Sequence, residues 1–299
     1  MARKRTYPIV LAHGIAPFDF ITNKLLQRIN VFCWDFSLAF DRLHYFRKIS
    51  THLRKHQFDV YATRVSFAAS AQARAENLAV QIRNMLEQSD QEKVHIIGHS
   101  MGGLDSRRMI VQENMADKVA SVTSIGTPHH GTSFADFGLA QGGEQLIALV
   151  DRKADFSGFL DLTRSIWKTF NEEVRNQEAT NSVVYQTYAA VQERELLFPP
   201  LRPCWDIVYA EEGENDGLVS RDSQRWQEKL IADDGTEKVI IRKDFPIAAD
   251  HLNQTGWWDI GELGRANWWR LNLLREKRQF EAAIRDVYLS IARSLADFQ

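Results

Sequence analysis

The sequence predicts an α/β fold in which helices cover both faces of a mostly parallel central sheet. Short apolar runs, typical of buried strands, alternate with segments whose apolar residues recur at helical spacing. Strands separated by helices of this length pair in parallel through right-handed crossovers. The chain has 299 residues, 44% of them hydrophobic and 25% charged, so it can bury a large core. We expect a single domain that spans residues 1–299.

Four apolar runs in the first half of the chain are predicted to form strands. They lie at 8–12, 60–65, 94–97 and 119–125. The segments between them carry apolar residues at helical intervals and predict helices at 43–56, 71–87 and 101–113. This order of elements is the basis for the parallel sheet.

The alternation stops at about 132–181, where we expect an inserted helical cap. This stretch contains helical patterns with apolar faces at 144–150 and 159–170. Strand character returns at 183–191, 205–210 and 238–242. At the end of the chain, residues 275–298 predict a closing amphipathic helix, with Phe280, Ile284, Val287, Ile291 and Leu295 at helical intervals.

Composition excludes several classes of partner and site. The formal net charge is −2, so no basic excess points to nucleic acid or to an anionic membrane surface. Cys33 and Cys204 are too few for a disulfide framework and lack metal-knuckle spacing; one disulfide remains open, but two buried thiols are favoured. The apolar run near the N-terminus is too short for a signal peptide, and no run could span a bilayer. The expectation is a cytoplasmic protein without a transmembrane anchor, or a secreted one whose signal peptide has been removed.

The sequence Gly98-His99-Ser100-Met101-Gly102 fits the pattern G-x-S-x-G, directly after a predicted strand and at the start of a predicted helix. A turn this tight brings flanking residues so close that only glycine fits, which explains Gly98 and Gly102. The turn exposes the Ser100 hydroxyl near the positive end of the helix dipole. We therefore predict that Ser100 is a nucleophile.

A serine nucleophile needs a histidine base and a carboxylate that orients the base. His251 lies downstream of every predicted strand, in a polar loop, and is the best base among nine histidines. Asp216 is the leading carboxylate because it lies in a loop that follows the predicted strand at 205–210. An Asn-Asp-Gly run is also a common plain turn. The alternatives are Asp206, Asp222 and Asp244, with Asp250 weaker because it adjoins the histidine.

Acyl transfer also needs donors for the oxyanion of the tetrahedral intermediate. One is expected to be the backbone N–H of Met101, the residue after the nucleophile. The second is expected from the loop after the first strand, where we choose the N–H of Ile15. Gly14 would let this loop turn inward, and His13 would orient it.

Several motifs along the chain together resemble the bacterial and fungal triacylglycerol lipases of the α/β-hydrolase superfamily. They are LAHGI at 11–15, GHSMGGLDSRR at 98–108, SIGTPHHGT at 124–132, LTRSIWKTFNEE at 162–173, EGENDGLVS at 212–220 and DHL at 250–252. The resemblance implies an α/β-hydrolase fold and lipase activity without a cofactor. It aligns Ser100, Asp216 and His251 with the catalytic triad of the family and Ile15 with its oxyanion residue.

The chain departs from the secreted bacterial relatives at their structural calcium site. Those relatives hold the ion through an aspartate two residues after the catalytic histidine, where this chain has Asn253. A neutral amide is a poorer ligand for a hard dication, and Glu193 and Glu195 match the upstream acidic position only approximately. We therefore predict no structural calcium and no other metal.

The substrate is expected to be a lipid or a small ester. The apolar stretch 23–46 predicts an acyl pocket, with Phe32 and Phe36 as candidate lining residues, and the helices of 134–170 either open at a lipid–water interface or simply cover the core. Alternatives with the same triad are a short-chain carboxylesterase, a thioesterase or a phospholipase. A non-catalytic binding protein on the same fold is the alternative from another class.

Overall fold

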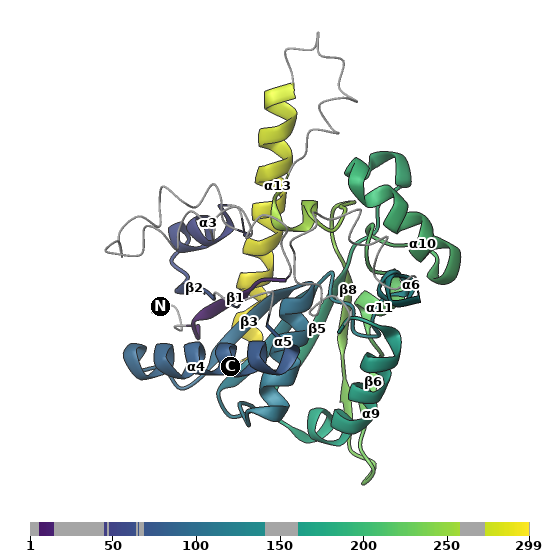
Figure 1. Cartoon of the computed structure of the whole chain (residues 1–299). Helices are drawn as coiled ribbons and strands as arrows, with labels where there is room; N and C mark the ends of the chain where they lie inside the picture. Colours follow the sequence, from purple (N-terminus) through teal and green to yellow (C-terminus); the bar gives the residue numbers. More distant parts are fainter. Residues whose placement is uncertain are drawn as a thin grey trace.

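The centre of the molecule is a six-stranded parallel sheet with the strand order β2-β1-β3-β4-β5-β8 (Figure 1). This computed structural model describes residues 6–14, 45–46, 48–63, 65, 69–140, 161–257 and 273–298. The strands are β1 (Ile9–Ala12), β2 (Val60–Ala62), β3 (Val94–His99), β4 (Val119–Ile125), β5 (Val184–Ala189) and β8 (Ile241–Asp244). Every neighbouring pair is parallel, as the sequence predicts.

Helices lie between and after the strands. The α-helices are α3 (Ile49–Lys55), α4 (Ala71–Ser89), α5 (Met101–Gln112), α6 (Ser133–Ala140), α9 (Arg164–Thr180), α10 (Arg202–Glu212), α11 (Arg221–Arg225) and α13 (Leu273–Ser294). Short 3-10 helices are η1 (Arg194–Leu196), η2 (Pro199–Leu201), η3 (Asn253–Thr255) and η4 (Leu295–Phe298). An antiparallel ribbon pairs β6 (Lys229–Ile231) with β7 (Glu237–Val239).

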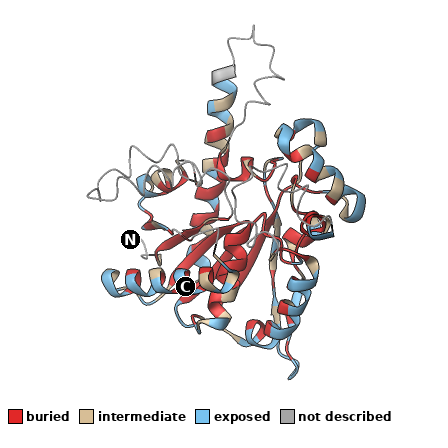
Figure 2. Ribbon diagram, viewed as in Figure 1, coloured by how far each residue is buried: buried red, intermediate tan, exposed pale blue. Residues whose placement is uncertain are grey.

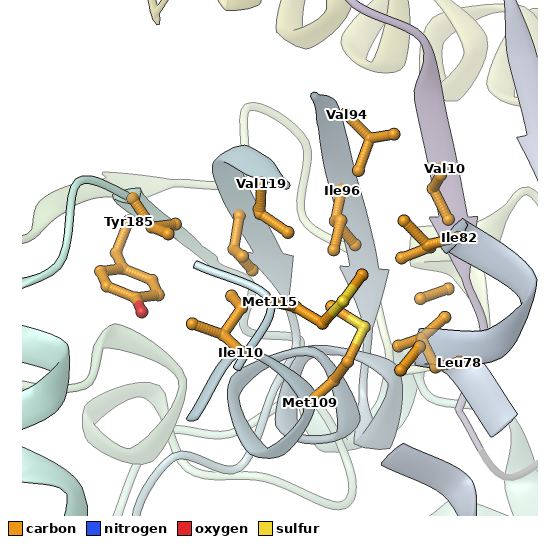
Figure 3. Close-up of a cluster of buried hydrophobic side chains, with 14 of the residues drawn as sticks. Val10, Leu78, Ile82, Val94, Ile96, Met109, Ile110, Met115, Val119 and Tyr185 are labelled. Atoms are coloured by element: carbon orange, nitrogen blue, oxygen red, sulfur yellow. The ribbon is translucent and has the colours of Figure 1, made fainter. Parts of the chain in front are cut away.

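Two apolar clusters, one on each face of the sheet, form most of the core. Val10 and Ile96 point to the face covered by α4 and α5, where they meet Leu78 and Met109 (Figure 3). Their strand neighbours, which include Leu11 and Ile97, point to the opposite face and pack with side chains of α3 and α13. Because successive strand residues face opposite sides, a strand covered on both faces has few exposed residues and is rich in apolar ones. The central strands are accordingly buried along their length (Figure 2).

Most predicted elements agree with the structure, but one strand is wrong. Residues 205–210 belong to helix α10. Pro203 in the first turn presets the backbone angle of a helix, and Cys204 and Val208, four residues apart, are its buried residues. The segment at 238–242 is split between β7 and β8, and the helix predicted at 43–56 begins only at Ile49.

The predicted cap region contains α6 and α9, while its helical pattern at 144–150 lies outside the described residues. Trp167 and Phe170 of α9 pack against Met101 and Leu104 of α5. The division into one domain with an inserted cap stays a prediction. Within the described part of the chain, no helix has the length and apolar character needed to cross a membrane. Cys204 is buried, and Cys33 lies outside the described residues.

Candidate active site

The turn between β3 and α5 has the geometry that the glycine pattern predicts. Ser100 has φ 55° and ψ −128°, a strained conformation for a residue with a side chain. A Cβ atom on Gly102 would lie 2.2 Å from the carbonyl oxygen of Ala12, and one on Gly98 would lie 2.7 Å from the backbone nitrogen of Gly103. Both contacts are with backbone atoms, so neither position has room for a side chain.

The structure brings Ser100, His251 and Asp216 together. Nε2 of His251 lies 2.8 Å from Oγ of Ser100, and Nδ1 of His251 lies 2.8 Å from Oδ2 of Asp216. An ionised carboxylate only accepts hydrogen bonds, so Nδ1 carries the proton and Nε2 is left to accept the serine hydroxyl. All three side chains are almost fully buried, with Asp216 at 0% exposure.

Asp216 is held by its own loop. Its Oδ1 accepts the backbone N–H groups of Leu218 at 3.1 Å and Val219 at 2.9 Å, and its backbone carbonyl accepts the N–H of His251 at 2.9 Å. The expectation that this loop follows a strand is wrong, because helix α10 precedes it. The Asn-Asp-Gly run does form an Asx-type turn, and this turn also presents the second carboxylate oxygen of Asp216 to His251.

The alternative carboxylates lie elsewhere. Asp206 pairs with Arg194, and Asp244 pairs with Arg221 and Arg225, all on exposed surfaces. Asp222 is an exposed residue of α11. Asp250 accepts backbone N–H groups of Phe198, Leu252 and Asn253. Asp250 therefore shapes the histidine loop, while Asp216 contacts the imidazole.

Two further histidines, His95 and His99, lie in β3 and are neutral at neutral pH. Burial lowers the pKa of His95 to about 4, and its Nδ1 lies 2.8 Å from Oγ of Ser121. Burial also lowers the pKa of His99 well below the usual value, and positive charge on His251 adds to this effect. Neither residue is suited to be a general base at neutral pH.

The loop after β1 packs directly against Ser100. A Cβ atom on Gly14 would lie 2.6 Å from Cβ of Ser100, so the close approach requires glycine. His13 donates from Nδ1 to the carbonyl of Gly14 at 2.8 Å and accepts the N–H of Val65 at Nε2, 3.2 Å away. His13 thus orients the loop, as expected. Met101 is the first residue of α5, whereas Ile15, Phe32 and Phe36 lie outside the described residues.

The sequence reasoning missed Gln254 and Tyr45. Nε2 of Gln254 donates to Oδ2 of Asp216 at 2.7 Å, and Oε1 of Gln254 lies 3.1 Å from Nε2 of His99. The hydroxyl of Tyr45 lies 2.7 Å from Nδ1 of His99. The partners of Gln254 are 38 and 155 residues away in sequence, so no local pattern marks it. Its only signal is its position three residues after His251.

No metal site can be assembled from the part of the chain that the structure describes, where no three histidine, cysteine or acidic side chains are grouped to hold an ion. Nδ2 of Asn253, at the position compared with a calcium ligand, donates to the carbonyl of Trp257 at 2.7 Å. The absence of a structural calcium ion stays a prediction.

This chain resembles known proteins in both sequence and structure. A family model described as "alpha/beta hydrolase fold" matches residues 7–146. A triacylglycerol lipase of Pseudomonas fragi is 27% identical over 93% of this chain and 97% of its own. Triacylglycerol lipase 2 of Saccharomyces cerevisiae is 27% identical over 97% of this chain and 91% of its own. The crystal structure of a metagenomic carboxyl esterase superposes with a TM-score of 0.65 at 17% identity, covering 99% of this chain and 77% of that one.

Proposed function

We propose that this chain, which belongs to the lipase-like family of α/β-hydrolases and is a carboxylic ester hydrolase, cleaves acylglycerols through an acyl-enzyme formed on Ser100. The observation that carries the proposal is the continuous pair of 2.8 Å contacts from Asp216 through His251 to Ser100. These side chains come from three separate loops, and their meeting supplies a nucleophile, a base and an orienting acid.

The mechanism follows from the directions of the hydrogen bonds. Asp216 holds the proton on Nδ1 of His251, so Nε2 takes the proton of the Ser100 hydroxyl as its oxygen attacks the ester carbonyl. The backbone N–H of Met101, at the N-terminus of α5, and that of Ile15 are the proposed oxyanion donors. His251 then gives its proton to the leaving alcohol, and water, activated by His251 in the same way, releases the acid.

The named activity of the relatives supports acylglycerols as the substrate class. Two relatives of nearly the same length are triacylglycerol lipases, and the acyl pocket would lie beside the loop that follows β1, with Phe32 and Phe36 as candidate lining residues. A short-chain carboxylesterase is the second candidate, because the fold, shared with a carboxyl esterase, and the triad suit it equally. A thioesterase or a phospholipase would use the same triad and would differ in the shape and polarity of its substrate pocket.

A substrate series tests the activity and the substrate class together. Wild type and Ser100→Ala are assayed on p-nitrophenyl acetate, butyrate and palmitate and on emulsified tributyrin and triolein. The expected result is hydrolysis of the emulsions by the wild type and a loss of about 10,000-fold or more in kcat for Ser100→Ala on every ester. Hydrolysis of acetate and butyrate alone would favour the short-chain esterase. Activity retained by a folded Ser100→Ala protein would contradict the proposal.

A further inference from the structure

We propose that Gln254 is a positioning residue: its amide group links the imidazole of His99 to the carboxylate of Asp216 and so fixes that carboxylate toward His251. The inference rests on the proposed function, because it concerns how the acid of the triad is held. It adds to the triad a hydrogen-bonded chain of three side chains, the buried Gln254 and His99 and the partly buried Tyr45.

The direction of every hydrogen bond in this chain follows from Asp216. A carboxylate only accepts, so the NH₂ group of Gln254 must face Oδ2 of Asp216 and the amide oxygen must face His99. His99 must then donate from Nε2, which leaves Nδ1 to accept the hydroxyl of Tyr45 at 2.7 Å. One arrangement of protons satisfies all the groups, so the chain has a defined polarity.

In the hydrogen-bonded chain of Gln254, His99 and Tyr45, the His99 ring is a fixed neutral dipole. Its side chain is fully buried, and the His251 ring lies 4.7 Å away between centroids. When His251 becomes an imidazolium ion during the reaction, a second positive charge on His99 would be opposed by both burial and repulsion. His99 therefore keeps its single proton on Nε2, toward Gln254, throughout the catalytic cycle.

Gln254 supplies the fourth hydrogen bond to a buried carboxylate. Oδ1 of Asp216 accepts two backbone N–H groups, and Oδ2 accepts both His251 and Gln254, at 2.8 and 2.7 Å. Without Gln254, Oδ2 has one donor, and the two backbone N–H groups on Oδ1 alone oppose a turn of the carboxylate about its last bond, away from the line to Nδ1 of His251. Such a turn weakens the hydrogen bond and the charge stabilisation that Asp216 gives to the His251 imidazolium ion, which forms only during the reaction.

The surroundings of Gln254 are built around its side chain. Its backbone carbonyl accepts the hydroxyl of Tyr288 from α13 at 3.1 Å. Gly126, at φ 58°, leaves the space for the amide, since a Cβ atom there would lie 2.2 Å from Oε1 of Gln254. At the other end of the chain, the Tyr45 hydroxyl lies 2.9 Å from where a Cβ atom on Gly14 would be. The hydrogen-bonded side chains of Gln254, His99 and Tyr45 thus extend from Asp216 to the loop after β1, which is predicted to supply an oxyanion donor.

The test uses two replacements of Gln254. Gln254→Leu keeps the approximate volume and removes both hydrogen bonds; we expect kcat on p-nitrophenyl butyrate to fall about 10-fold with KM changed less than about two-fold, because a transition-state interaction is lost. Gln254→Glu retains both bonds only while the new carboxyl is protonated, since a protonated acid donates and accepts as the amide does. Burial beside Asp216 favours that protonated form toward neutral pH.

The pH dependence separates positioning from a structural role. The ratio of kcat for Gln254→Glu to kcat for wild type is expected to approach one near pH 6 and to fall as pH rises toward 9, when the carboxyl ionises and repels Asp216. The same ratio for Gln254→Leu is expected to stay constant with pH. Gln186 of β5, equally buried and bonded to Thr123, is the matched control: Gln186→Leu and Gln186→Glu should keep the wild-type kcat per folded molecule.

The outcomes also separate this inference from the proposed function. If Gln254→Leu keeps the wild-type kcat while Ser100→Ala is inactive, the positioning role is overturned and the hydrolase remains. If Gln254→Leu does not fold, Gln254→Glu decides alone, because its protonated form preserves the contacts: a pH-independent ratio overturns the inference. Activity in Ser100→Ala would instead remove the proposed function and, with it, this role.

Discussion

The turn that carries Ser100, called the elbow, and the loop that carries Asp216 contribute to the same site but are held in place in different ways. The elbow, 94–112, is limited most tightly by shape: Gly98 and Gly102 lie against backbone atoms and leave no room for a side chain, while buried polar residues of its helix, such as Asp105 and Arg107, are paired. The acid loop, 213–220, is held by hydrogen bonds, from its own backbone to Asp216 and from the distant Gln254. Close packing against backbone sets the tightest limit in the first region, and hydrogen bonds to a buried carboxylate hold the second.

The difference predicts that the two regions fail differently. A change of volume in the elbow should reduce stability, because neighbouring backbone cannot move away. A change of charge or donor in the acid loop should reduce the rate and leave the fold largely intact, because the site keeps its shape. Variants of similar size in the two regions can therefore test whether the contrast holds.

The largest effect is expected from Asp216→Asn. The new side chain is isosteric, but an NH₂ group that faces Nδ1 of His251 puts the ring proton on Nε2, which then cannot accept the proton of Ser100, and kcat should fall about 10,000-fold. The melting temperature should change by only a few degrees. Ester kinetics and a thermal melt on the same sample measure both quantities.

Asp206→Asn is the matched control for this variant. Asp206 was an alternative acid by sequence, but it pairs with Arg194 on the surface, so its kcat should stay within about two-fold of wild type. A large loss in Asp206→Asn, or a small one in Asp216→Asn, would show that the acid of the site has been assigned to the wrong residue.

A smaller but still large effect is expected on stability from Gly102→Ala. Inside a helix this change normally stabilises a protein by about 0.5–1 kcal/mol. Here the new Cβ would lie 2.2 Å from the carbonyl oxygen of Ala12, so we expect a loss of about 3 kcal/mol or more in the free energy of unfolding. Urea denaturation measures the change.

Gly235→Ala provides the comparison for Gly102→Ala. Gly235 has φ 87°, but nothing lies within 4 Å of the added Cβ, so the cost is limited to backbone strain of about 1–2 kcal/mol. If the two variants were equally destabilised, close packing of the elbow would not explain the role of Gly102.

The last effect arises only at acid pH and concerns His95, which lies in β3. The folded protein binds a proton on His95 only near pH 4, whereas the unfolded chain binds it near pH 6.5. The unfolded state therefore holds more protons between these values, and the free energy of unfolding falls as pH drops from 6.5 toward 4. His95 alone should account for a loss of about 3 kcal/mol across this range.

His95→Gln should remove this part of the pH dependence. The amide can still bond to Ser121 but does not titrate. His99 and His129, whose pKa values are also lowered by burial, act in the same direction and remain in both proteins. The difference between the wild-type and variant stability curves, from denaturation at pH 6.5 and at pH 4.5, isolates His95. Parallel curves would mean that burial of this histidine does not govern the acid response.

The same contrast explains what could be predicted from the sequence. The elbow is local: five residues, a preceding strand and a following helix define it, and its strained turn with two flanking glycines could be predicted. The parallel sheet was predictable for the same reason, since each strand and helix has its own periodicity. His251, whose ring contacts Ser100, was predicted from its position after the last strand, which depends on chain order.

What could not be predicted depends on contacts between distant segments. Apolar residues at 205–210 fit a short strand as well as a helix face, and the tertiary contacts of Cys204 and Val208 decide for the helix. Local chemistry favoured Asp216 over Asp206 and Asp244 only for its place in a loop after a predicted strand, and that segment is a helix. The fold adds that Asp206 and Asp244 pair with arginines on the surface. Gln254 is an ordinary polar residue until Asp216 and His99 are placed beside it.

Covalent labelling of the nucleophile tests the central claim most directly. Wild-type protein is treated with a fluorophosphonate, and the site of the adduct is mapped by peptide mass spectrometry. A serine activated by His251 and Asp216 should give one adduct, on Ser100, which is absent in Ser100→Ala and forms much more slowly in Asp216→Asn. An adduct on another residue, or a wild-type protein that hydrolyses esters without being labelled at Ser100, would contradict the account.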